Sequence, residues 1–418
     1  MSTPRAELLP ILLDDRGVRD WIDGFLLLGV LVGLLGSLLI AWQYHLDTDP
    51  RLIGLHFLAL NAGYVIAVAI AQRLLFRVSI RAVTLGACAI GFATLVGLSV
   101  AAPPVSTIWR IAGLGFVGIA GGALATSLLY ALEPYFSQAP AVLANWAGLL
   151  FGSGCLLSTS MVGITYFAGS VQIETALLAI VPLIYFVLYA SNKFRPARKP
   201  AESREEENRM RATLKSVRSI AAVLFGVLLF VQFGNEWAIA GWLPLFLIHR
   251  LGANPVWAIF ALGAYFLALT IGRLMAQRLL PRVNHRRLLL ASIVTAMIGC
   301  LLLSLASSMP EAWLAVILIG AGFAPIYPLV AESLDDRFSY HPGFYNGIFS
   351  VAITGAMLAP WLLGYVDGYF GTRYVMLLPA LGSIAVLGVA LLITLEAHLM
   401  SGNGGDKVQL SMAAKEKS

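Results

Sequence analysis

The side chains best suited to bind a polar solute lie together in the middle of one long apolar run. Glu236 is flanked by Asn235 and Trp237, Gln232 lies four residues before it, and Trp242 follows. Residues four apart share a face of an α-helix, so the amide of Gln232 and the carboxylate of Glu236 would point the same way. Amides and carboxylates hydrogen-bond hydroxyl groups, and indole rings pack on flat apolar surfaces. We therefore expect these five residues to bind a substrate of the sugar type.

Amide, hydroxyl and aromatic side chains in other apolar runs are further candidates for the same site. In the second half of the chain they are Tyr265, Tyr327, Asn346 and Trp361, and in the first half they are Asn61, Tyr64, Thr126, Tyr130, Asn145 and Trp146. Packing between helices is the alternative role for each. We expect about half of the first-half set to line a cavity.

Two carboxylates are candidates for carrying a coupled proton. An ionisable group at membrane depth costs about 2.5–3.5 kcal/mol on insertion scales, so Glu236 needs a partner, water or a function. Substrate binding, proton coupling and packing against an amide or basic neighbour all stay open for it. Asp23 opens the first apolar run, where capping of the helix is the alternative role.

The elements that position these residues must be membrane helices. The chain is 59% hydrophobic and 12% charged, whereas soluble domains have about 45–50% and about 25%. Most runs are apolar all round, so their outer faces require lipid. Runs of about 20 apolar residues predict twelve helices, at 23–44, 51–72, 82–102, 107–132, 139–167, 171–191, 219–248, 254–277, 287–307, 312–332, 343–366 and 373–396.

The basic residues predict the orientation of these helices. Most of them lie on the side of both termini, including a charged stretch at 192–218, and the opposite loops hold only Arg51, Arg110, Arg250 and Arg373. Basic loops stay in the cytoplasm. The sequence therefore predicts a multi-pass protein of the inner, cytoplasmic membrane with both termini in the cytoplasm.

An internal repeat divides the chain into two halves. Residues 71–78 read AQRLLFRV and residues 276–283 read AQRLLPRV, which differ at one position. Six helices per half give the halves the same orientation, and substrates of such repeats bind at the repeat interface. We expect an N-terminal segment at 1–22, a six-helix bundle at 23–191, a linker at 192–218, a second bundle at 219–396 and a disordered tail at 397–418.

The repeated loop resembles the signature of the major facilitator superfamily, roughly G-x-x-x-D-R-x-G-R-[KR] between helices 2 and 3 and again between helices 8 and 9. The first copy matches at Gly63, Arg73, Arg77 and Arg81, with Gln72 in the acidic position, and the second runs from Gly272-Arg273 to Arg286-Arg287. The resemblance implies an all-α fold of two pseudo-symmetric six-helix bundles. It also implies a latch between the halves, for which the candidates are Arg73, Arg77, Arg278 and Arg282.

Three stretches are similar to the sugar-carrying, fucose-permease-like branch of that family. They are Gly234-Asn235-Glu236 with Trp242-Leu243-Pro244, the segment from Gly322 to Pro328, and the segment from Gly347 to Pro360. The branch implies sugar transport by alternating access, with proton symport as an option. It commonly has an acidic residue in helix 4, where this chain has Thr126 and Ser127.

We therefore expect a secondary transporter of a small polar solute, a sugar or a sugar derivative. The alternatives are an exporter of amphipathic drugs or lipids and, in another class, a non-transporting membrane sensor or partner-binding protein. The sequence has no ATP-binding motif, and no pattern of a nucleophile beside a base indicates an enzyme. The cysteines Cys88, Cys155 and Cys300 do not have the spacing of metal ligands. We expect no cofactor, no metal and no nucleic-acid partner, and we expect a monomer. The variants Glu236→Gln and Trp242→Ala should lose uptake of the solute.

Overall fold

The computed structural model describes residues 16–46, 48–136, 140–167, 171–191, 220–279, 282–337 and 342–415, and this part of the chain is helical without a strand. Among these described residues, eleven helices are long and apolar enough to cross a membrane. A twelfth span is the bent pair Gly17–Gly33 and Leu35–Ala41. The predicted fold class, a twelve-helix membrane protein, is confirmed.

The helices follow the predicted runs closely. In the first half they are α2 (Arg16–Ile22), α3 (Gly24–Gly33), α4 (Leu35–Ala41), α5 (Pro50–Leu75), α6 (Ile80–Val100), α7 (Thr107–Phe136), α8 (Pro140–Phe167) and α9 (Val171–Ala190). In the second half they are α11 (Ile220–Leu251), α12 (Pro255–Leu279), α13 (His285–Leu305), α14 (Met309–Phe323), α15 (Ile326–Arg337), α16 (Pro342–Phe370), a 3₁₀ turn η1 (Thr372–Tyr374) and α17 (Leu377–Lys415).

Polar caps in the short turns define where several helices begin. The side chain of Asp49 accepts a hydrogen bond from the Arg51 amide at 2.9 Å, just before Pro50 opens α5. The side chain of Ser79 caps α6, and that of Asn284 caps α13. Such caps satisfy amides that have no partner inside the helix, which explains why the helices start at these residues.

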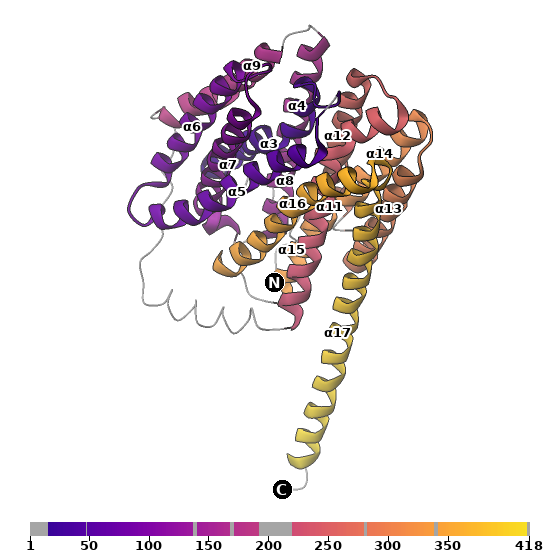
Figure 1. Ribbon diagram of the computed structural model, residues 1–418. Coiled ribbons are helices and arrows are strands. Elements are labelled where there is room, and N and C mark those ends of the chain that lie inside the picture. The colour runs from indigo at the N-terminus through magenta and orange to yellow at the C-terminus, as the bar shows by residue number, and fades with distance from the viewer. Residues whose placement is uncertain are drawn as a thin grey trace.

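The same helix pairs recur in the two halves. In the first half α3 packs on α8, α5 on α7 and α6 on α9. In the second half α11 packs on α16, α12 on α14 and α13 on α17. The two sets correspond helix by helix, so the halves are built alike, and they lie side by side in Figure 1.

The halves meet along two matching seams. One seam joins α5 to α16 and the other joins α8 to α12, while α4 also contacts α11. We call the end of the bundle where α9 ends and α11 begins the linker face, and the other end the far face. A site between the seams is reached only through one of these faces.

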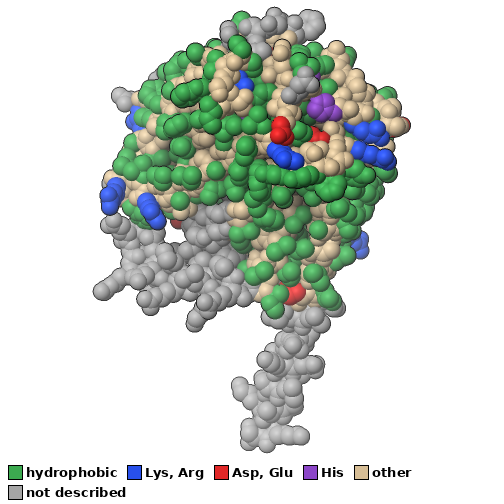
Figure 2. Space-filling model, viewed as in Figure 1, with side chains coloured by type: hydrophobic (Ala, Val, Ile, Leu, Met, Phe, Trp, Pro, Cys, Tyr) green, Lys and Arg blue, Asp and Glu red, His purple; other side chains and the backbone are tan. Residues whose placement is uncertain are grey.

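The outer surface is apolar, as lipid requires. Figure 2 shows hydrophobic side chains over most of the visible face and only a few charged groups. Exposed large side chains include Ile66, Ile70, Phe116, Leu188 and Leu392. Exposure of this extent is costly in water and costs nothing in hydrocarbon.

The structure differs from the predicted elements at three places. The first span, predicted at 23–44, is divided at Leu34. The tenth is divided between α14 and α15 at Ala324-Pro325, where proline lacks the amide that a continuous helix needs. In addition, α17 continues to Lys415 across the segment expected to be a disordered tail (Figure 1). Hydropathy marks the end of a membrane span, and a helix can continue past it because its hydrogen bonds are internal.

Candidate functional site

A cavity lies between the two halves. Its empty volume is about 1460 Å³, its open mouth included, and its walls come from α3, α5, α7 and α8 of one half and α11, α12, α15 and α16 of the other. The lining reaches Glu133, Phe136 and Leu334, which lie near the ends of their helices at the linker face. The cavity therefore extends from the middle of the bundle toward the linker face.

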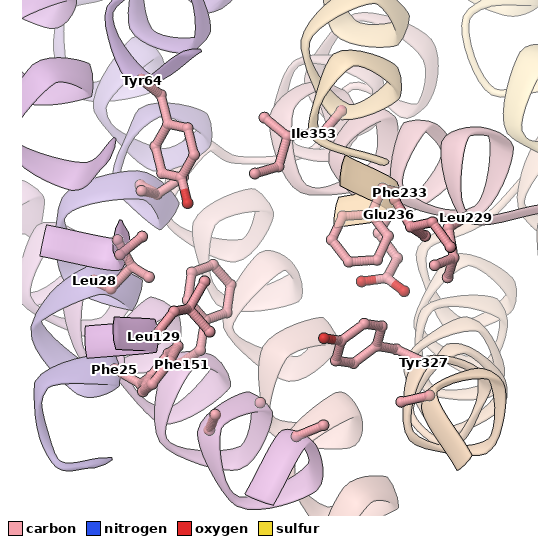
Figure 3. A pocket seen from close by; sticks show the side chains of 18 of the residues that line it. Phe25, Leu28, Tyr64, Leu129, Phe151, Leu229, Phe233, Glu236, Tyr327 and Ile353 are labelled. Atoms are coloured by element: carbon pink, nitrogen blue, oxygen red, sulfur yellow. The ribbon is translucent and has the colours of Figure 1, made fainter. Parts of the chain in front are cut away.

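Most of the cavity wall is aliphatic or aromatic. Figure 3 shows Phe25, Leu28, Leu129 and Phe151 on the first half. On the facing half it shows Leu229, Phe233 and Ile353. Such a wall can pack against apolar surface from both halves, and the few polar groups in it can fix the orientation of a bound molecule.

Glu236 is the carboxylate at the centre of α11. Its Oε1 accepts a hydrogen bond from Nε2 of Gln232 at 3.0 Å, as the spacing of four residues predicts. Its backbone carbonyl accepts from the hydroxyl of Tyr265 at 3.4 Å. In Figure 3 the carboxylate points into the space between the halves, near the hydroxyl of Tyr327. This carboxylate is therefore accessible from the cavity.

Arg273 on α12 also lines the cavity, and sequence reasoning did not select it as a site residue. Its guanidinium donates through Nη1 to the carbonyl of Gly148 on α8. Its own carbonyl accepts from the amide of Asn145 at 3.3 Å. The signal in the sequence was an arginine inside an apolar run, but the same residue belonged to the repeated loop motif and was assigned to that.

Three of the six first-half candidates line the cavity, namely Asn61, Tyr64 and Tyr130. The amide of Asn61 donates to the Phe57 carbonyl of its own helix at 2.8 Å, which leaves its oxygen for other partners. Tyr64 points into the space opposite Glu236 (Figure 3). With Glu236, Trp237 and Tyr327 from the second half, these groups are the predicted residues that the structure brings together.

Other candidates face elsewhere. Asn235 is buried against Gly382 of α17, so it does not accompany Glu236 into the cavity. Thr126 bonds the Gly122 carbonyl of its own helix at 2.8 Å. The cavity lining also excludes Gln232, Tyr265, Asn145, Trp146 and Trp361, although the first three contact residues that line it.

Trp242 is fully buried and closes the far face instead of lining the cavity. Its ring stacks on Phe57 of the other half at 6.4 Å between centroids, and its Nε1 donates to the Pro360 carbonyl at 2.8 Å. Nearby, Nε2 of His249 donates to the His45 carbonyl across the two halves at 2.9 Å. The halves are thus joined at the far face and separated by the cavity at the linker face.

The remaining predicted residues lie outside the cavity lining or outside the described side chains. The latch candidates are exposed, Arg73 and Arg278 at the ends of α5 and α12 and Arg77 and Arg282 in the turns that follow. Asp23 is exposed between α2 and α3 and makes no capping hydrogen bond with its side chain. Asn346 belongs to α16, and its side chain is outside the part that the structure describes.

A second buried arginine shows what a purely structural role looks like. Arg110 donates through Nε to the Tyr44 hydroxyl, through Nη1 to the Val105 carbonyl and through Nη2 to the Thr107 hydroxyl, each at 2.8 Å. The Tyr44 hydroxyl lies 3.1 Å from Nε2 of His56. Each nitrogen of the Arg110 guanidinium therefore has a protein partner, and the group fastens α7 to the turn after α4.

Comparison with known proteins shows the family of this chain. The model of the Major Facilitator Superfamily matches residues 22–354. The chain belongs to this family. It is a multi-pass membrane protein, as the twelve spans require.

Solved structures of the same family share the fold. The chain covers 98% of the fucose:proton symporter FucP in the outward conformation, with 90% of its own length, 19% identity and a TM-score of 0.66. It covers 96% of a D-xylose-proton symporter, with 89% of its own length, 15% identity and a TM-score of 0.69. It covers 99% of the nucleoside transporter NupG, with 90% of its own length, 14% identity and a TM-score of 0.67.

Curated relatives match over part of their length. An uncharacterized MFS-type transporter of Yersinia pestis is 24% identical over 46% of this chain and 48% of the relative. An uncharacterized MFS-type transporter of Mycobacterium tuberculosis is 31% identical over 40% of this chain and 24% of the relative. The matched region thus spans about half or less of these relatives.

Proposed function

We propose that this protein is a secondary transporter that moves a small organic solute across the cytoplasmic membrane by alternating access. The observation that carries the proposal is the asymmetry of the space between the halves. The cavity reaches the linker face, whereas Phe57, Trp242, His45 and His249 join the halves at the far face. Rocking of the halves around a central site would close the linker face and open the far face.

The proposed solute is polar, a sugar or a sugar derivative, and the transporter is a monomer. Glu236, Asn61 and the tyrosine hydroxyls of the lining are suitable partners for hydroxyl groups, and Trp237 supplies a ring. Sugar carriers are among the solved structures with this fold. Glu236 is also the candidate for a coupled proton, and the basic loops favour cytoplasmic termini.

A second candidate is an amphipathic solute, and the aromatic wall favours it. Phe25, Phe151 and Phe233 offer no hydrogen bonds to a sugar but bind apolar groups well. Export of such a solute would use the same cavity. The two candidates differ in the kind of solute, which a transport assay with vesicles measures.

The experiment is uptake into proteoliposomes with a panel of labelled sugars, organic acids and amphipathic cations. Glu236→Gln keeps the size of the side chain, so the folded yield should match that of the wild type. We expect at least a tenfold loss of uptake in Glu236→Gln, and partial recovery in Glu236→Asp. Wild-type uptake by the Gln variant would remove this carboxylate from the mechanism, and absence of uptake for the entire panel would favour a non-transporting sensor.

A further inference from the structure

Arg273 is a buried cation that the proposed transport of a neutral solute does not use. The side chain is 6% exposed, lies in the second half of α12 and faces the cavity. A charged side chain at membrane depth is costly and requires compensation by partners, water or a ligand. The question is therefore which group compensates the charge of Arg273.

The protein itself compensates this charge only in part. Nη1 donates to the Gly148 carbonyl, and Nε is buried without a hydrogen-bond partner. Arg273 and Glu236, the carboxylate that shares the cavity, lie close enough for their charges to interact. The structure records no ion pair between them, and the Glu236 carboxylate is bound by Gln232. Arg273 differs in this respect from Arg110, in which each nitrogen has a partner.

The wall around Arg273 is shaped to hold the guanidinium at the cavity. A Cβ atom at Gly148 would lie 3.1 Å from the guanidinium carbon, and one at Gly152 would lie 3.6 Å from Nη1. Asn145 holds the backbone of Arg273 from the other half. Small residues on α8 thus leave the room in which the guanidinium is placed.

We propose that Arg273 forms an anion-binding subsite and that the transported solute carries a single carboxylate or a similar oxyanion. This inference rests on the proposed function. A guanidinium binds oxyanions through parallel N–H donors, which gives both strength and orientation. The aromatic and aliphatic wall formed by Leu28, Leu129 and Phe151 holds the rest of the solute. Because Glu133 and Glu236 line the same cavity, a second negative charge on the solute is unfavourable.

Binding measurements on the purified full-length protein test this subsite without transport. The probes are two matched pairs, benzoate with benzyl alcohol and glucuronate with glucose, together with the dianion phthalate. Within each pair the two compounds share a ring and differ in the carboxylate. Titration calorimetry with wild type, Arg273→Gln, Arg273→Lys and the exposed control Arg287→Gln gives the preference for the carboxylate within each pair.

We expect the wild type to prefer the carboxylate at least tenfold in one pair and to bind phthalate more weakly than benzoate. Arg273→Gln should bring the preference close to one, Arg273→Lys should keep part of it, and Arg287→Gln should keep all of it. A purely structural role would weaken both members of a pair equally. Equal affinities in the wild type, an unchanged preference in Arg273→Gln, or no carboxylate binding up to roughly 10 mM overturns the proposal.

The outcome is separable from the test of transport. Carboxylate binding that depends on Arg273, without uptake into vesicles, would keep the subsite and remove the carrier function. Uptake of neutral solutes without any preference for carboxylates would do the reverse.

Discussion

Glu236 and Arg273 are held at the cavity by amides and carbonyl groups of neighbouring residues. Gln232 binds the carboxylate, and the Gly148 carbonyl binds the guanidinium. Buried charges that are bound in this way stay available to a solute, whereas a direct ion pair would have to break first. Both charges can therefore take part in binding without a large rearrangement.

The spacing of residues explains which site predictions succeed. Gln232 and Glu236 are four residues apart, and the hydrogen bond between them is present. Asn235 is adjacent to Glu236, and successive residues are turned by about 100° around a helix, so its amide faces α17. Arg273 had no such neighbour pattern, because its partner on α8 is a backbone carbonyl, which no side-chain motif reveals.

Replacement of Trp242 tests the contact at the far face. Trp242→Ala removes a fully buried ring, and we expect a loss of stability of about 3–5 kcal/mol. Trp242→Phe keeps an aromatic ring against Phe57 but cannot donate to the Pro360 carbonyl, so we expect a loss of about 1 kcal/mol. Chemical unfolding of the purified variants measures both, and equal losses would show that the hydrogen bond, and not the ring, dominates. A loss of uptake by Trp242→Ala would thus reflect packing.

The surroundings of His45 predict that the far face responds to pH. Burial and the nearby His249 lower the pKa of His45 below its ordinary value, and Asp367 lies close enough to His249 to be affected by its charge. The closed far face favours the neutral form of His45. The stabilisation of this closed face is therefore complete above the ordinary pKa of histidine and is lost as the pH falls through the lowered pKa. We expect distances between spin labels across the far face to lengthen between pH about 7.5 and about 5. His45→Gln should show no such change, and an unchanged wild type would contradict the assignment.

At the scale of the helices, the sequence predicted the membrane spans but not the breaks within them. Runs of apolar residues predicted the spans because lipid demands them, but they did not predict the breaks at Leu34 and at Ala324-Pro325, where the backbone is interrupted within an apolar run. The second break comes just before Tyr327, which lines the cavity. Proline and glycine were visible in the sequence, but their effect on a helix depends on its neighbours.

Two glycines of the same helix pair provide a matched test of this packing. A Cβ atom at Gly355 of α16 would lie 2.7 Å from the Phe230 carbonyl carbon of α11, whereas one at Gly226 of α11 would have its nearest neighbour, Val351, at 4.0 Å. We expect Gly355→Ala to lose about 1–3 kcal/mol of stability. Gly226→Ala should be neutral or slightly stabilising, because alanine favours a helix over glycine by about 1 kcal/mol. Thermal unfolding in detergent measures the difference, and equal effects would contradict the described α11–α16 packing.

For the whole molecule, the sequence supplied the number of spans and the repeat, and the structure adds the state of the two faces. Hydropathy and the repeated AQRLL segment do not depend on which face is open. The closure of the far face depends on contacts between residues distant in sequence, such as Arg51 over the ring of Tyr369 at 4.4 Å. These contacts are absent from any local pattern.

A reversible lock on the far face tests the central claim that the halves move about the cavity. A Cβ atom at Gly368 would lie 3.5 Å from Cγ of Arg51, close enough for a disulfide between Arg51→Cys and Gly368→Cys. The native cysteines Cys88, Cys155 and Cys300 are buried, so they should not compete. Each single variant serves as a control. Exchange of a labelled solute across the membrane of proteoliposomes is measured before and after oxidation. We expect loss of exchange on oxidation and recovery on reduction, and undiminished exchange by the cross-linked protein would contradict movement of the halves about the cavity.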